Sequence, residues 1–163
     1  MKKIHTLCEN ILKGVQDKQR VSGKPDILPI SSLTEMDAFE DIDDNDYSNV
    51  VNYFRYIGGF NLKEAINLCF KEAMKDSLTP SFTWWDREEE QRALYNTCLV
   101  MAIYDGVCNN RHFQKPTRSE FQAQMKEILR TAKERLRHKR RGPRTQSTAN
   151  RRRIHRDLWN DEQ

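Results

Sequence analysis

Residues 47–59 read YSNVVNYFRYIGG, and the apolar side chains in this stretch recur every three or four positions. That spacing places them on one face of an α-helix, where they can pack against a core. The two glycines at its end can stop the helix, because glycine adopts a positive φ without strain. The stretch therefore predicts an amphipathic helix that ends at Gly58-Gly59. Its expected inner face consists of Tyr47, Val50, Val51, Phe54 and Ile57.

Helices are also predicted on both sides of this stretch. Three residue pairs have the spacing of a capping box, in which side chains at a helix start bond backbone N–H groups. They are Ser32 with Glu35, Asn61 with Glu64, and Thr117 with Glu120. Apolar periodicity predicts the helices that follow these pairs, over residues 33–40, 62–73 and 118–136, and one more helix over residues 88–104. Strand alternation is nearly absent, so the predicted fold class is all-α, a small bundle of short helices.

Residues 77–86, with Pro80 and the pair Trp84-Trp85, predict an irregular and largely buried connection. Adjacent residues in a loop rarely share one face. We therefore expect one tryptophan to anchor the core while the other is more exposed. Stacking on bases or filling a partner's pocket is the alternative function of the pair.

The 163 residues allow one modest domain with polar extensions. Four segments are predicted: an amphipathic helix over 1–17, a linker over 18–29, a helical domain over 30–136 and a disordered basic arm over 137–163. No apolar run approaches the ~18 residues of a membrane span. Four cysteines at irregular spacing predict reduced thiols inside the cell rather than a disulfide scaffold.

Charge is strongly divided along the chain, although the net charge is only +4. Residues 25–50 hold eight acidic and no basic side chains, whereas residues 126–163 hold thirteen basic and five acidic ones. Such asymmetry is typical of chains with an acidic flank and a basic arm. The acidic flank could dock a basic partner, fold back on the basic arm, or simply be a solvated helix end.

The basic arm is the main candidate for function. Dense Lys and Arg side chains attract phosphates and release counterions, which predicts salt-sensitive and largely non-specific binding to nucleic acid. Two clusters, 139–141 and 151–153, are also spaced as a bipartite signal for a nuclear import receptor. A solvated tail that aids solubility is the third interpretation. The candidate residues are Lys139, Arg140, Arg141, Arg144, Arg151, Arg152, Arg153 and Arg156.

An apolar stripe near the N-terminus is the candidate partner-binding element. A helix this short is marginal alone, so it has to pack on its own core, on a partner or on a second copy in a homodimer. The stripe consists of Ile4, Leu7, Ile11, Leu12 and Val15.

Signals for a metal, a cofactor or catalysis are weak. Cys98, Cys108 and His112 lack the paired spacing and the fourth ligand of a zinc site. The acidic run 35–46 lacks the spacing of a calcium loop. Cys69 and Cys98 fall on apolar helical stripes, where cysteine usually packs as a small hydrophobe. No cofactor, metal or catalytic residue is therefore predicted.

Several segments resemble one known family over residues 27–139. They are Leu28–Ile30, Val51–Phe54, Ile57–Gly59, Leu62–Ala65, Phe82–Trp84, Pro116-Thr117 and Ala132–Leu136. This pattern resembles the domain of unknown function 4806, a module of invertebrate proteins with no established activity. The chain departs from that pattern at Trp84–Glu90, where the family usually carries a basic stretch. The layout also loosely resembles the BEN domains, which bind DNA and chromatin partners; this likeness implies architecture only.

Together these patterns predict a non-enzymatic protein of the nucleus that binds nucleic acid or chromatin through its basic arm. The alternative is a protein-interaction or self-association adaptor whose arm serves only nuclear import. No membrane partner is predicted. A basic face continuous with the arm would favour nucleic acid, and an apolar groove without a basic rim would favour the adaptor.

Overall fold

The structure is a computed structural model that describes residues 23–85 and 90–142. Within these residues the fold is helical apart from two very short strands, which confirms the all-α fold class. Residues 1–17 and the arm beyond residue 142 lie outside the described residues. The elements are α2 (Leu33–Glu40), α3 (Asp44–Ile57), α4 (Leu62–Ala73), η1 (Asp76–Ser81), β1 (Phe82–Thr83), β2 (Arg92–Ala93), α5 (Cys98–Cys108) and α6 (Arg118–Arg141).

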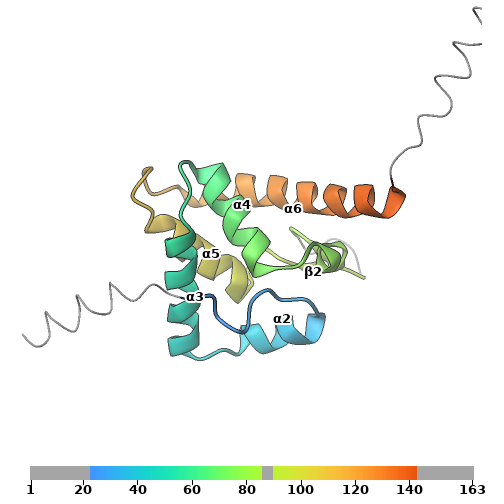
Figure 1. Cartoon of the computed structure of the whole chain (residues 1–163), viewed down its shortest axis with the longest axis horizontal. Coiled ribbons are helices and arrows are strands. Elements are labelled where there is room, and N and C mark those ends of the chain that lie inside the picture. Colours follow the sequence, from blue (N-terminus) through green and yellow to red (C-terminus); the bar gives the residue numbers. More distant parts are fainter. Residues whose placement is uncertain (1–22, 86–89, 143–163) are drawn as a thin grey trace, which may run out of the picture.

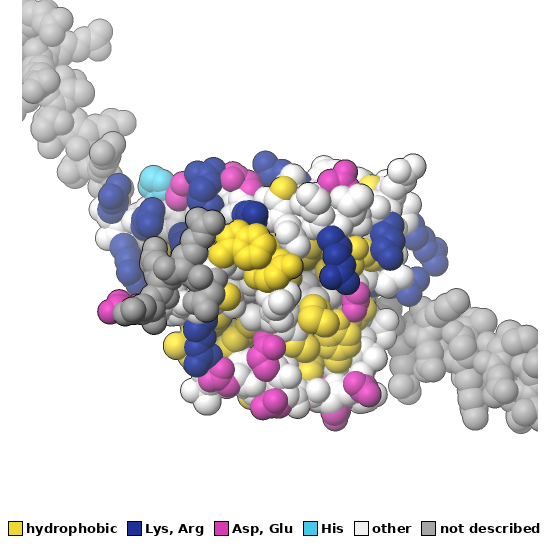
Figure 2. Space-filling view, turned by 180° about the vertical axis from the view of Figure 1, so that it is seen from behind, with side chains coloured by type: hydrophobic (Ala, Val, Ile, Leu, Met, Phe, Trp, Pro, Cys, Tyr) yellow, Lys and Arg dark blue, Asp and Glu magenta, His cyan; other side chains and the backbone are white. Residues whose placement is uncertain are grey.

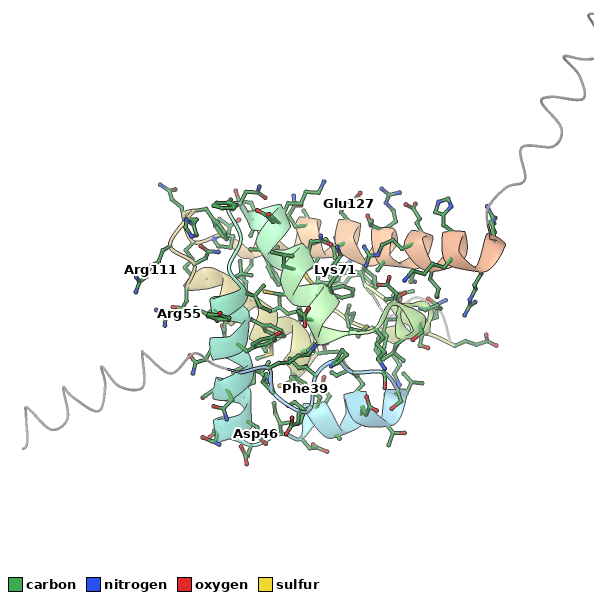
Figure 3. The ribbon with its side chains drawn as sticks, in the orientation of Figure 1. Phe39, Asp46, Arg55, Lys71, Arg111 and Glu127 are labelled. Carbon is green, nitrogen blue, oxygen red and sulfur yellow. The ribbon has the colours of Figure 1, made fainter. Side chains whose placement is uncertain are left out.

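The helices pack around α4 and α5, with α2 and α6 on opposite sides (Figure 1). α3 packs along α5, while α4 contacts both α5 and α6. The C-terminal end of α6 projects past the rest of the fold. The core consists of apolar side chains from the segment before α2, from all five α-helices and from the connection after α4; its largest members include Phe39, Phe54, Phe70, Phe82, Ile103 and Met125. In Figure 3, Phe39 points from α2 into this core, whereas Asp46 lies at the solvent-exposed start of α3.

The predicted helix starts and the predicted glycine stop are confirmed. Ser32, Asn61 and Thr117 are the N-cap residues of α2, α4 and α6, and each side chain accepts a backbone N–H bond. At α6 the capping box is complete, because a carboxylate oxygen of Glu120 accepts the Thr117 N–H at 2.9 Å. α3 ends at Gly58, whose φ is 69°. These short-range bonds explain why the local sequence is sufficient to place these four helices.

The acidic residues after α2 start the next helix. Asp43 is the N-cap of α3, and its side chain accepts the N–H of Asp46 at 2.7 Å. The acidic side chains between residues 35 and 46 are exposed to solvent. This part of the acidic flank therefore supplies a helix cap and exposed helix ends, and the three interpretations of its role stay predictions.

The helix predicted over residues 88–104 is wrong in its first part, because α5 begins only at Cys98. The backbone N–H groups of Leu94 and Tyr95 bond the carbonyls of Thr83 and Trp84, so this segment runs beside β1. Thr97 then caps α5, which continues past Tyr104 to Cys108. The apolar spacing in residues 88–97 is compatible with either a helix or an extended segment. The backbone bonds to Thr83 and Trp84 decide for the extended segment.

Leu28 of the predicted linker and Ile30, the first residue of the predicted helical domain, belong to the core. Leu28 is 5% exposed, and Ile30 is fully buried. The Ile30 N–H bonds the carbonyl of Ala73 at 2.9 Å, and the Ile30 carbonyl accepts the N–H of Lys75 at 2.9 Å. Ile30 is thus tied to the C-terminal end of α4.

The prediction for the two tryptophans is confirmed. Trp84 is 7% exposed and belongs to the core, whereas Trp85 is 37% exposed. Among the described residues, no helix is long and apolar enough to cross a membrane.

Candidate nucleic-acid interface

The C-terminal end of α6 carries a run of basic residues beyond the apolar core. Apolar side chains of α6 are buried up to Ala132, but the helix continues to Arg141 before Gly142 ends it with a φ of 64°. Residues 137–141 are all exposed and include Lys139, Arg140 and Arg141. Cations are favourable in this place, because the C-terminus of a helix carries a partial negative charge. The prediction that the helix ends at 136 and a disordered arm begins at 137 is therefore wrong over residues 137–141, because α6 continues through them and carries three of the predicted arm residues.

A groove runs between this part of α6, the C-terminal end of α4 and the start of η1. Its volume is about 560 Å³. The lining residues are Lys71, Met74, Lys75, Asp76, Ser77, Arg135, Leu136 and Lys139. Four of these eight side chains are basic and only one is acidic, so the groove carries an excess of positive charge. Lys71, which lies on the last turn of α4, is labelled in Figure 3.

The single carboxylate of the groove is engaged by an arginine. The Arg135 guanidinium donates two hydrogen bonds to Asp76, at 2.8 and 3.0 Å. These bonds are the largest cause that lowers the pKa of the Asp76 carboxyl, and the positive charges of Lys139 and Lys71 lower it further. Because Asp76 and Arg135 satisfy each other in a half-buried pair, Lys71, Lys75 and Lys139 remain in excess at the rim.

Helix geometry divides the basic residues of α6 between two faces. Lys139 follows Arg135 by four residues, so both face the groove. Arg140 and Arg141 lie on other faces of the helix and are exposed. The remaining predicted site residues lie outside the described residues: Arg144, Arg151, Arg152, Arg153 and Arg156 of the arm, and Ile4, Leu7, Ile11, Leu12 and Val15 of the N-terminal stripe.

The sequence interpretation missed Lys71 and Lys75. Lys71 lies on the last turn of α4, whereas Lys75 follows the helix in extended backbone, so helical spacing does not relate the two. Near the end of a helix such cations also favour the helix dipole, which is sufficient reason for their presence. Their proximity to Lys139 depends on the packing of α4 against α6 and has no local signal.

A second hollow of about 580 Å³ lies between α3 and α5. Inside it, the Tyr47 hydroxyl donates a 2.7 Å hydrogen bond to Asp105. Burial raises the pKa of the Cys108 thiol at its edge, so this thiol is protonated at neutral pH. The hollow thus holds an uncharged thiol and a carboxylate that accepts a hydrogen bond from a tyrosine.

The weak zinc pattern is not assembled by the fold. Cys98 and Cys108 are the first and last residues of α5, about 15 Å apart along the helix axis. Among residues 23–85 and 90–142, no three His, Cys, Asp or Glu side chains are grouped so that they could hold a metal ion.

Comparison with known proteins gives no match to a protein-family model, a curated protein or a solved structure. The resemblance to the domain of unknown function 4806 therefore stays a prediction.

Proposed function

We propose that this protein is a non-enzymatic nuclear protein that binds nucleic acid or chromatin through phosphate contacts. The observation that carries this proposal is the basic groove, which joins the structured domain to the basic end of α6. Lys71 and Lys75 line the groove from the end of α4, and Lys139 lines it from α6, two residues before that helix ends at Arg141. The groove thus reaches the first residues of the predicted arm, which lie on α6, and such a basic surface is expected of a nucleic-acid-binding protein.

Lysines at this density act on phosphates as point charges and carry no sequence preference. Binding to the groove and the arm would therefore be non-specific in sequence and sensitive to salt. The same arm contains the two clusters suited to a nuclear import receptor, so import and nucleic-acid binding are compatible functions. For the adaptor alternative, the assigned residues 4–15 lie outside the described residues, so that alternative stays a prediction.

The test is a salt titration of the full chain binding to a random DNA duplex. Replacing Lys71, Lys75 and Lys139 by alanine removes three phosphate contacts. The slope of log K against log salt should then become less negative by about 2 to 3.

A matched control changes three exposed bases outside the groove: Arg55→Ala, Arg111→Ala and Lys115→Ala. Figure 3 shows Arg55 and Arg111 at the end of the molecule away from the C-terminus of α6. The control has the same net charge as the groove variant but should keep the salt slope of the unaltered chain. Equal slopes in the two variants would reject the groove as the contact. No binding by the unaltered chain at low salt would reject the proposed function itself.

A further inference from the structure

Beside α6 lies a compact exposed group of aromatic rings. The Trp85 and Tyr95 rings lie 4.5 Å apart between centroids at an angle of 41°. Trp85 is 37% exposed and Tyr95 is half-buried, so the pair reaches the surface. Figure 2 shows an apolar patch on one face of the molecule, with Lys and Arg side chains beside it.

The backbone holds this aromatic pair in place. The Thr83 hydroxyl donates to the Trp85 carbonyl at 2.6 Å, and the Tyr95 N–H bonds the Trp84 carbonyl at 3.2 Å. Underneath, the buried Trp84 ring meets both rings edge-on, at 6.3 Å from Trp85 and 5.8 Å from Tyr95. The two exposed rings are therefore preorganised before any ligand arrives, which lowers the entropy cost of binding one.

A basic stripe begins at this aromatic pair and runs along α6 toward the arm. Its first member, Lys126, places its ammonium 5.0 Å from the centre of the Trp85 ring. Basic residues follow at intervals of three or four positions, which keeps them on one face of the helix. The stripe consists of Lys126, Arg130, Lys133, Arg137 and Arg140. It is about 21 Å long at 1.5 Å per residue.

Two acidic residues reduce the charge of the stripe but do not cancel it. Arg130 bonds Glu127 at 2.6 and 3.1 Å and Glu134 at 2.8 Å. Figure 3 shows Glu127 on the outer side of α6. Along α6 the five bases of the stripe thus outnumber these two acids.

An aromatic pair at the start of a basic track is the arrangement that binds single-stranded nucleic acid. Bases can stack on the rings, while the backbone phosphates follow the positive charges. In a duplex the bases are stacked on one another, so only the phosphates are available to this surface. We infer that the Trp85–Tyr95 pair and the α6 stripe form a site for single-stranded nucleic acid, with one or two bases stacked on the rings.

Lys126 covers the Trp85 ring in the free protein, and a base can displace it. An exposed cation–π contact contributes about 2- to 5-fold to an equilibrium, whereas stacking of a base on an aromatic side chain contributes about 5- to 150-fold. The exchange is therefore favourable, and the released Lys126 ammonium is then available to a phosphate. This inference rests on the proposed function and names its ligand class.

The experiment compares labelled single strands, dT20 and rU20, with a 20-base-pair duplex, using the full chain at fixed salt. We expect both single strands to bind more tightly than the duplex. Trp85→Ala should weaken single-strand binding at least about 5-fold and leave duplex binding within about 2-fold. Trp85→Phe, which keeps an aromatic face, should lose less. Phe60→Ala is the matched control, because Phe60 is 78% exposed on another part of the surface and should change neither affinity.

A second readout needs no substitution at the site. In a Trp159→Phe background the fluorescence comes from Trp84 and Trp85, and dT20 should quench the part from the exposed Trp85 whereas the duplex should not. Tighter binding of dT20 than of rU20, or the reverse, would show whether the natural ligand is DNA or RNA, and either result supports the proposed site. Equal binding of single strands and duplex, or equal losses for both after Trp85→Ala, would overturn the inference and leave the proposed function standing. Failure of every oligonucleotide to bind would reject both.

Discussion

The junction between α3 and α4 depends on two adjacent glycines with different requirements. Gly58 has φ 69° and ψ −145°, a conformation that is almost restricted to glycine. A Cβ at this residue would still have space, since its nearest neighbour is the Tyr56 carbonyl oxygen at 3.8 Å. Gly59 has φ 139°, and a Cβ there would lie 2.6 Å from both the Cα and the N of Ala65. Gly59 thus has both a conformational and a steric requirement.

The two alanine substitutions should therefore destabilise the fold unequally. Gly58→Ala incurs only the conformational cost, about 1–3 kcal/mol. Gly59→Ala incurs a similar conformational cost and a further ~1–3 kcal/mol, because the buried backbone of α4 has to move away. Its total of about 2–6 kcal/mol is a large part of the 5–15 kcal/mol that stabilises a typical domain.

Urea unfolding followed by far-UV circular dichroism measures both variants. Gly23→Ala is the control, because Gly23 has no atom within 4 Å of its Cβ position and no positive φ; this variant should stay within ~0.5 kcal/mol of the unaltered chain. If Gly59→Ala were as stable as Gly58→Ala, the close approach of Gly59 to α4 would not be a steric constraint, and the reasoning would be refuted.

Two further predictions follow from pKa shifts. Hydrogen bonds from Arg135 lower the pKa of the Asp76 carboxyl in the folded state, so this pair stabilises the fold fully above the unfolded pKa of about 3.9. That contribution is lost as the pH falls through the lower folded pKa; Asp76→Asn should therefore destabilise the protein at pH 6, and its difference from the unaltered chain should shrink by pH 2 in urea unfolding. A difference that stays constant with pH would contradict the role of the pair. Burial raises the pKa of the Cys69 thiol to about 12, so iodoacetamide at pH 8 should modify Cys69, mapped by mass spectrometry, only in denaturant. Rapid modification of native Cys69 ahead of the half-exposed Cys98 would show that the core opens readily.

The groove and the α6 stripe lie on surfaces of the same long helix, and the proposals assign them different contacts. The groove lysines are suited to phosphates of any nucleic acid, whereas the aromatic pair distinguishes stacked from free bases. A groove variant should thus weaken binding to duplex and single strand alike. A Trp85 variant should change only the preference between them.

Local sequence was sufficient for most of the helical elements. A side-chain cap such as Asn61, and a stop such as Gly58, act within one turn of the chain and need no distant partner. The segment before α5 was different, because the backbone bonds of Leu94 and Tyr95 go to residues about eleven positions earlier. An apolar pattern cannot distinguish these bonds from the bonds of a helix.

The candidate interface likewise combines features that are predictable from local sequence with contacts that depend on distant segments. Local patterns were enough to predict that basic charge gathers in residues 126–163, that the last long helix starts at Thr117, and that one of two adjacent tryptophans is exposed. The positions of Lys71 and Lys75 across a groove from Lys139, and of Lys126 over Trp85, became visible only in the folded chain. Charge and helix periodicity are properties of neighbouring residues, whereas both of these contacts join residues at least forty positions apart that meet only when α6 packs on the core.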